Sequence, residues 1–264
     1  MLKITSLNKT FNPGTVNEKR AICDVSLTVN DGDFITIIGS NGAGKSTLLN
    51  MIAGNVSTDS GHIVLGDKDI TYFSDVKRAK FIGRVFQDPM MGTAPDMWIE
   101  ENLALAFRRT KSHTLKWGIK ASERELYIKT LAQLGLGLED RLRSKVGLLS
   151  GGQRQAVTLL MATLQKPELL LLDEHTAALD PKTASTVLEL SDKIIREHSL
   201  TTLMVTHNMQ NAIDYGNRLI MMHEGRIILD VAGEKKKALT VEALLKQFEA
   251  LSGAEFSNDR ALLS

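Results

Sequence analysis

The stretch from Phe34 to Ala53 constrains the fold of this chain more than any other. It begins with the uncharged, largely β-branched run Phe34–Ile38, which is typical of a buried strand. A glycine-rich turn follows, and Lys45–Ala53 then has the composition of a helix that ends at Gly54. A strand, a glycine turn and a helix in this order favour an α/β fold.

The turn matches a phosphate-binding loop. Gly39, Gly44, Lys45 and Ser46 fit the pattern G-x-x-x-x-G-K-[ST]. Glycines let successive backbone N–H groups turn inward around a phosphate, and the helix N-terminus adds positive potential. The Lys45 ammonium can reach the β- and γ-phosphates, and the Ser46 hydroxyl can ligate Mg²⁺. The predicted nucleotide contacts are Gly39, Ser40, Asn41, Gly42, Ala43, Gly44, Lys45, Ser46 and Thr47.

The bulk composition narrows the class of protein. The formal net charge is only +1 over 264 residues, which argues against a strongly electrostatic nucleic-acid binder. Cys23 is the single cysteine, so an internal disulfide is excluded. No apolar run approaches the ~20 residues that cross a bilayer, and Met1–Thr5 lacks the apolar core of a signal peptide. We therefore expect a soluble cytoplasmic chain that reaches a membrane only through a partner.

Strand and helix patterns extend the α/β prediction along the chain. Residues 1–33 alternate apolar and polar positions as antiparallel strands do, and Asn30–Asp33 carries a hairpin signal. From about residue 92 to 149 the composition is helical, with a capping box at Ser122–Glu125. Strands that alternate with helices predict an α/β fold with a mainly parallel sheet core, an antiparallel β flank and an inserted helical subdomain.

Two segments carry weaker signals. The basic segment 108–117 favours a solvated loop, and a contact with phosphate-rich ligands or lipid headgroups is the alternative. Residues 253–264 have no clear strand or helix pattern, so we expect them to form a loosely held C-terminal tail.

Two carboxylates follow the apolar run Leu169–Leu172, which is typical of a central parallel strand buried on both faces. Ligands of open α/β sheets bind at the carboxyl ends of the strands, so Asp173 and Glu174 are expected at the same edge as the phosphate loop. Asp173 is suited to hold Mg²⁺, and Glu174 to polarise a water for attack on the γ-phosphate. A strand that happens to end in two surface acids is the alternative.

A second anion site is predicted where a helix begins after Leu149. Ser150 is a good N-cap, and Gly151 and Gly152 leave backbone N–H groups unobstructed at the positive end of the helix. Gln153 completes the sequence Leu-Ser-Gly-Gly-Gln. A glycine-rich helix start without a ligand is the alternative.

These three motifs, in this order and separation, resemble the ATP-binding cassette (ABC) ATPases, and the resemblance covers essentially the whole chain. It implies ATP and Mg²⁺ as cofactors and ATP hydrolysis as the activity. By this resemblance, Phe11 corresponds to the aromatic residue that stacks on adenine. Gln87 corresponds to the Q-loop glutamine that senses the γ-phosphate, helps to hold Mg²⁺ and meets the transporter partner. Asp180 lies in the D-loop, and His207 corresponds to the switch histidine that contacts the γ-phosphate.

The resemblance also implies how such a cassette is used. Two copies pack head to tail, so that Ser150, Gly151, Gly152 and Gln153 of one close over the ATP of the other, and closure drives transport. We expect a homodimer on the inner face of the cell membrane, bound to an integral-membrane permease, with a solute-binding protein in the full system and no nucleic-acid partner. Residues 1–252 are expected to form one domain with a RecA-like core, whose helical subdomain spans about 92–152.

The chain departs from the usual pattern next to the predicted catalytic carboxylate. His175 stands where most cassettes have proline, and Ala177 where serine is usual. The variants at His175–Ala178 and Ala156–Leu164 resemble those of a subgroup of small-solute importers, so the expected function is import of a solute such as an amino acid. An ABC exporter is the alternative, followed by a soluble cassette protein that acts on DNA or ribosomes.

Overall fold

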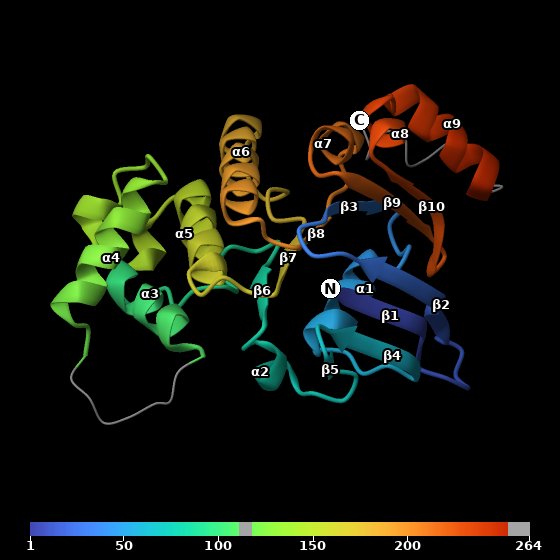
Figure 1. Cartoon of the computed structure of the whole chain (residues 1–264), viewed down its shortest axis with the longest axis horizontal. Helices are drawn as coiled ribbons and strands as arrows, with labels where there is room; N and C mark the ends of the chain where they lie inside the picture. The colour runs from blue at the N-terminus through green and yellow to red at the C-terminus, as the bar shows by residue number, and fades with distance from the viewer. Residues whose placement is uncertain (111–117, 253–264) are drawn as a thin grey trace. The chain divides into compact units, whose positions relative to one another are not determined.

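The computed structural model of the chain describes residues 1–110 and 118–252 (Figure 1). The chain forms two compact units, Met1–Arg78 together with Ser199–Ser264, and Ala79–His198. The first unit therefore combines both ends of the chain, and the second contains the middle. Most of the basic segment, residues 111–117, and the predicted tail 253–264 lie outside the described residues.

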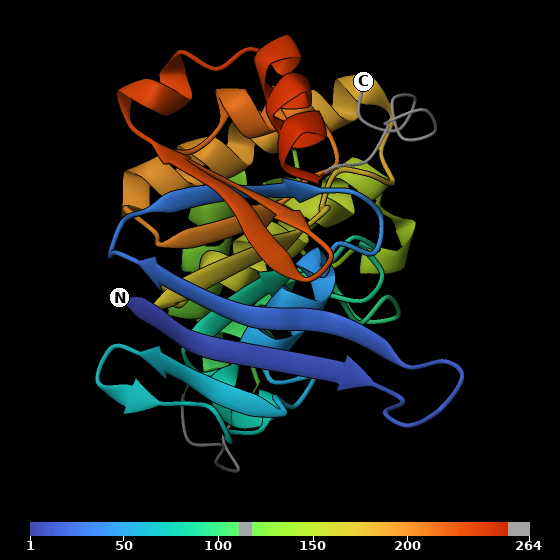
Figure 2. The ribbon, with the colours of Figure 1, turned by 90° about the vertical axis from the view of Figure 1, so that its right-hand side faces the viewer.

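The first unit contains an antiparallel sheet with the strand order β2-β1-β4-β5 (Figure 2). Leu2 pairs with Val29 and Ile4 with Leu27 across β1 and β2, and all four side chains are buried. The alternating sequence therefore gives this sheet one buried face, as predicted for the antiparallel flank. The strands are β1 (Leu2–Phe11), β2 (Lys19–Val29), β4 (Ser60–Leu65) and β5 (Lys68–Asp69).

A second group of strands in the same unit surrounds β3 (Phe34–Gly39). β3 lies between β8 (Thr202–Val205) and β9 (Arg218–His223) and pairs with both in parallel. β10 (Arg226–Ala232) continues from β9 as an antiparallel hairpin. Every residue of β3 is buried, which explains why its sequence is uncharged and does not alternate between apolar and charged positions.

The hairpin prediction at Asn30–Asp33 is wrong. The segment does turn, and the Asp33 N–H donates to the Asn30 carbonyl at 3.1 Å. The strands on either side, β2 and β3, nevertheless belong to different sheets. The residues Asn-Asp-Gly-Asp specify a local turn, whereas the partners of β3 come from residues 202–223 and cannot be read from the turn.

Helices α7 (Met209–Asp214) and α9 (Val241–Ser252) pack in this unit, where Met209 and Phe248 share a buried cluster with Ile38 of β3.

The buried Lys236 donates to the carbonyls of Tyr215 and Gly216, and burial lowers the pKa of Lys236 to about 8. The basic residues before α9 therefore form a short anchored helix. The other helices of the unit are α1 (Lys45–Ala53), α2 (Asp75–Arg78) and α8 (Glu234–Lys237).

The second unit is built on β6 (Ile82–Val85) and β7 (Leu169–Asp173), which pair in parallel. All five residues of β7 are buried, as expected for a central strand. Helices α5 (Gly151–Thr163) and α6 (Pro181–His198) belong to the same unit and contact each other.

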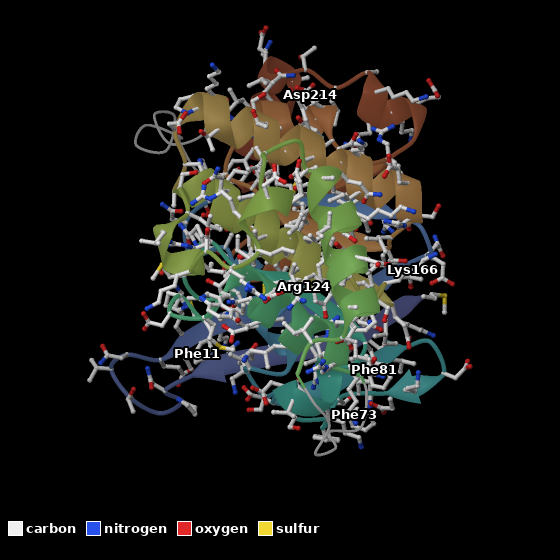
Figure 3. All side chains as sticks on the ribbon, turned by 90° about the vertical axis from the view of Figure 1, so that its left-hand side faces the viewer. Phe11, Phe73, Phe81, Arg124, Lys166 and Asp214 are labelled. Carbon is white, nitrogen blue, oxygen red and sulfur yellow. The ribbon has the colours of Figure 1, made fainter. Side chains whose placement is uncertain are left out.

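A helical segment separates β6 from α5. It contains α3 (Ile99–Arg108), α4 (Ala121–Ala132) and the 3₁₀ turns η1 (Glu139–Arg141) and η2 (Val146–Leu148). Figure 3 labels Arg124, which lies on α4. Glu100 of α3 is 2% exposed and lies 2.6 Å from Nε of Arg124. Because a buried carboxylate needs a compensating charge, this ion pair ties α3 to α4.

The capping box predicted at Ser122–Glu125 begins two residues too late. Helix α4 begins at Ala121, and the Glu123 carboxylate accepts the Lys120 N–H at 3.0 Å. The capping glutamate is therefore present in the predicted segment, but its partner is a backbone group that precedes the segment.

Among the helices of residues 1–110 and 118–252, none is long and apolar enough to span a bilayer.

Candidate functional site

The phosphate loop connects β3 to α1 as the sequence predicts. Gly44 precedes α1 with a left-handed backbone, φ 100°, and the Ala43 N–H donates to the Ser40 carbonyl at 3.1 Å. The buried Lys45 ammonium donates to the carbonyls of Gly39 at 2.7 Å and Ser40 at 3.1 Å. A helix N-terminus and a lysine therefore meet at one loop, which fits a phosphate group.

Neighbouring backbone leaves no room for side chains at two of the loop glycines. A Cβ on Gly44 would lie 2.5 Å from the Ala21 carbonyl oxygen of β2, and a Cβ on Gly39 would lie 2.1 Å from the Met222 carbonyl oxygen of β9. The Gly225 N–H, in the turn between β9 and β10, donates to the Ala43 carbonyl of the loop at 3.0 Å. These contacts fix the conformation in which the loop presents its amides.

Phe11 lies in the part of the antiparallel sheet that contacts the loop. Phe11 and Lys19 pair across β1 and β2, and Lys19 Nζ lies 3.1 Å from the position of a Cβ built on Gly42. The Phe11 ring is half-buried, and the Lys9 ammonium lies 5.7 Å from its centre. Phe11, the predicted adenine-stacking residue, is thus paired with a residue that lies beside the loop. That residue, Lys19, was not identified from the sequence.

His207 lies beside the same strand. It follows β8, and the Thr206 N–H donates to the Ile37 carbonyl of β3 at 3.1 Å. On the other side, Asn208 caps α7 by accepting the Asn211 N–H at 2.8 Å. The exposed His207 is therefore held between a strand end and a helix start, close to the end of β3 where the phosphate loop begins.

The second unit brings Gln87 and the two predicted carboxylates to one edge. Val85 of β6 pairs with Leu172 of β7, so Gln87 and Asp173 lie at the carboxyl ends of adjacent parallel strands. Glu174 follows with a left-handed backbone, φ 45°. Such a conformation is uncommon for a residue with a side chain and is concentrated at functional sites.

Asp173 is in contact with an arginine that the sequence did not identify. Arg84 Nη2 lies 2.8 Å from Asp173 Oδ2, and each side chain is 12% exposed. The guanidinium carbon of Arg84 lies 4.6 Å from the centre of the Phe86 ring. The only sequence signal was a single charged residue within the otherwise uncharged run Phe81–Phe86.

His175, which replaces the usual proline, is a packing residue of the β7–α6 connection. Its side chain is buried, and Nε2 lies 3.1 Å from Oγ of Ser191 on α6. The Ser191 hydroxyl donates its proton to the Val187 carbonyl at 2.7 Å, so its oxygen accepts the Nε2–H of His175. Burial lowers the pKa of His175 to about 4, so the imidazole next to Glu174 carries no charge at neutral pH.

We expect His175 to make the protein less stable in acid. Its folded-state pKa of about 4 lies below the unfolded value of 6.5, so the unfolded chain binds more protons between these values. As the pH falls through this interval, the free energy of unfolding should decrease by up to about 3 kcal/mol. Denaturant unfolding should show a much weaker decrease for His175→Gln and an unchanged one for the exposed control His198→Gln. Equal pH dependence in all three proteins would contradict this role.

Ser150 begins α5 as the predicted N-cap, which is confirmed. Its hydroxyl accepts the Gln153 N–H at 3.3 Å, while the Gln153 side chain accepts the Ser150 N–H at 3.2 Å. Further along α5, the buried Gln155 donates to the Phe86 carbonyl at 3.0 Å. The helix that carries the Leu-Ser-Gly-Gly-Gln motif is therefore joined directly to the segment that carries Gln87.

The two glycines of this motif pack against the segment that leads into α6. A Cβ on Gly151 would lie 3.1 Å from Cδ2 of Leu179, and a Cβ on Gly152 would lie 2.1 Å from Cγ2 of Thr183. Asp180 Oδ1 accepts the Thr183 N–H at 3.1 Å, and hydrogen bonds from Thr183 lower the pKa of Asp180. The segment around Asp180 and the glycine motif thus contact each other within one chain, and Asp180 caps the N-terminus of α6.

This packing predicts a rescue between two substitutions. Gly152→Ala should destabilise the protein by about 1–3 kcal/mol, because the new methyl group overlaps Cγ2 of Thr183. Thr183→Ser removes that carbon, so the double variant should recover most of the lost stability in denaturant unfolding. Equal losses in the single and double variants would contradict the contact. The ATP turnover of the refolded double variant then shows separately whether Gly152 must also remain bare for a ligand.

The oxygen donors assigned to Mg²⁺ have suitable chemistry. The Ser46 hydroxyl, the Asp173 carboxylate and the Gln87 amide supply the hard oxygen ligands that Mg²⁺ prefers. Ser46 is exposed in the first turn of α1 in the first unit, and Gln87 and Asp173 belong to the second. Within the second unit, Gln87 and Asp173 lie at adjacent strand ends and fit an ion that is otherwise held by water and nucleotide phosphates.

Known proteins are similar to this chain both in sequence and in fold. A family model described as "ABC transporter" matches residues 22–177. A tyrosine transport ATP-binding protein of Clostridioides difficile (strain R20291) is 49% identical over 250 residues, which cover 94% of this chain and 99% of that protein. The energy-coupling factor transporter ATP-binding protein EcfA2 of Enterococcus faecalis (strain ATCC 700802 / V583) is 31% identical, over 97% of this chain and 87% of the relative.

A solved dimeric structure of an ATP-binding cassette, in a post-hydrolysis state with bound ADP and Pi, superposes with a TM-score of 0.75. Its sequence is 28% identical to this one, and the superposition covers 88% of this chain and 98% of the solved chain. These similarities confirm the predicted fold class, a phosphate-loop NTPase with a parallel core, an antiparallel sheet and helices, and they confirm ATP binding and hydrolysis. The chain belongs to the ABC transporter family and is the subunit type of that family that binds and hydrolyses ATP.

Proposed function

We propose that this chain powers the import of a small solute such as an amino acid, by closing as a homodimer over two ATP molecules. The observation that carries the proposal is the near full-length similarity to a tyrosine transport ATP-binding protein. The dimeric cassette with ADP and Pi supports the dimer. In this proposal an integral-membrane permease holds the ATPase at the cytoplasmic face of the cell membrane, and a solute-binding protein delivers the solute.

Three groups of residues bind the nucleotide and metal in this proposal. Residues 39–47 hold the phosphates through backbone N–H groups and Lys45, and Phe11 stacks on adenine. Ser46, Asp173 and Gln87 hold Mg²⁺, which neutralises charge on the phosphates when it is bound. The fixed loop backbone and the Lys45 bonds described above support this assignment.

Glu174 acts as the base that orients and deprotonates the attacking water, and His207 contacts the γ-phosphate. Gln87 reports the state of the site to the permease. The hydrogen bond from Gln155 to the Phe86 carbonyl joins the Gln87 segment to α5, the helix that begins after Ser150. Residues 150–153 of the second copy complete the site in trans, and Asp180 lies in the D-loop at the same interface. Residues 1–252 work as one domain, with 92–152 as its helical subdomain.

Reconstitution with a permease tests the function. The chain should co-purify with an integral-membrane permease encoded beside its own gene, and the permease should stimulate ATP hydrolysis. In vesicles, ATP on the side of the cassette should drive solute toward that side, and the rate should depend on a solute-binding protein. Movement away from the cassette would instead support an exporter. Hydrolysis stimulated by DNA or ribosomes, and not by the permease, would support the remaining alternative.

A further inference from the structure

We propose that Arg84 is a positioning residue that competes with Mg²⁺ for the Asp173 carboxylate. The inference rests on the magnesium role proposed above for Asp173. It starts from the 2.8 Å contact between Arg84 Nη2 and Asp173 Oδ2, which joins residues 89 positions apart in the chain.

The contact is built into adjacent strands. Arg84 pairs with Leu171 across β6 and β7, so its side chain starts two residues from Asp173 on the neighbouring strand. Phe86, two residues further along the chain, points to the same face as Arg84. The guanidinium carbon of Arg84 lies 4.6 Å from the centre of the Phe86 ring. The register and the ring together hold the positive charge at the carboxylate.

The electrostatics of the pair have opposite consequences without and with metal. Both side chains are 12% exposed, so solvent screens their interaction weakly. An arginine is always charged, and it therefore compensates the buried carboxylate when no metal is present. A divalent cation that approaches Asp173 meets this positive charge and must share the carboxylate with it. Arg84 should therefore stabilise the metal-free protein and raise the Mg²⁺ concentration at which the nucleotide site fills.

A Mg²⁺ titration of nucleotide binding tests this inference without relying on turnover. Binding of a non-hydrolysable fluorescent ATP analogue is measured at increasing Mg²⁺, and thermal unfolding is measured in EDTA without nucleotide. Arg84→Met should lower the Mg²⁺ midpoint by at least about threefold and lower the melting temperature in EDTA. Arg84→Lys keeps the charge and should keep the midpoint within about twofold. Arg84→Gln should shift the midpoint as Met does, and it replaces that variant if Met prevents folding.

Asp173→Asn separates this inference from the function on which it rests. It should raise the Mg²⁺ midpoint strongly and should remove the effect of Arg84→Met in the double variant. A midpoint that is unchanged or higher in both neutral Arg84 variants, with Asp173→Asn still impaired, overturns the competition and leaves the magnesium role of Asp173 intact. A midpoint that neither Asp173→Asn nor the Arg84 variants change overturns the magnesium role itself.

Discussion

Replacing Glu174 by Gln should lower ATP turnover by about 10²- to 10³-fold while ATP binding is retained. The substitution preserves size and removes the carboxylate that would accept a proton from the attacking water. Glu174 directly follows β7 in a left-handed backbone conformation, so its direction is set by the strand end. With hydrolysis blocked, the closed dimer should accumulate in ATP, because opening depends on product formation.

Steady-state phosphate release and size-exclusion chromatography with ATP measure the two effects. Glu197→Gln on α6 is the matched control, since it also removes one carboxylate but is exposed and lies 4.0 Å from Lys193. This control should hydrolyse ATP at the wild-type rate. Normal hydrolysis by Glu174→Gln would show that another group activates the water.

Replacing Gly44 by Ala should abolish nucleotide binding and destabilise the protein by about 2–4 kcal/mol. The Cβ would lie 2.5 Å from the Ala21 carbonyl oxygen, and the residue would keep a φ of +100°. The neighbouring backbone belongs to β2 and to the β9–β10 turn, so it cannot move without disturbing two sheets. The loop would have to shift, and its amides would no longer point to one phosphate.

The control for this variant is Gly32→Ala. Gly32 has a φ of +79° and no atom within 4 Å of an added Cβ, so it carries the backbone strain without the clash. Its cost should be about 1 kcal/mol, with normal nucleotide affinity. Denaturant unfolding and equilibrium binding of a fluorescent ATP analogue compare the two variants. Equal losses in both would show that strain alone, and not contact with β2, makes Gly44 necessary.

The local features of the site could be predicted from sequence because each depends on neighbouring residues. Gly39–Ser46 needs only glycine spacing and a following helix, Ser150 needs only a helix start, and Asp173 needs only an apolar strand before it. In the structure the loop joins a strand to a helix, Ser150 caps a helix and Asp173 ends a strand, as expected. The family could be predicted from the order of these motifs along the sequence, because that order does not depend on the conformation of the loops.

Features that depend on strand register or distant packing could not be predicted. The pair of Arg84 and Asp173 requires β6 to lie beside β7 in the observed register. The neutral state of His175 depends on its burial against Ser191 of α6. The strands next to β3 come from residues 202–223, which is why a correct local turn at Asn30–Asp33 was assigned to the wrong partner strand.

Mixing two inactive variants tests whether each ATP site is completed by a second copy of the chain. Lys45→Ala removes the phosphate-loop lysine, and Ser150→Arg blocks the motif that should close over the partner's nucleotide. A mixed dimer then has one site with both defects and one site with none. Random mixing should therefore restore up to about a quarter of the wild-type ATP hydrolysis rate. A mixture that hydrolyses no faster than the separate variants would contradict completion in trans.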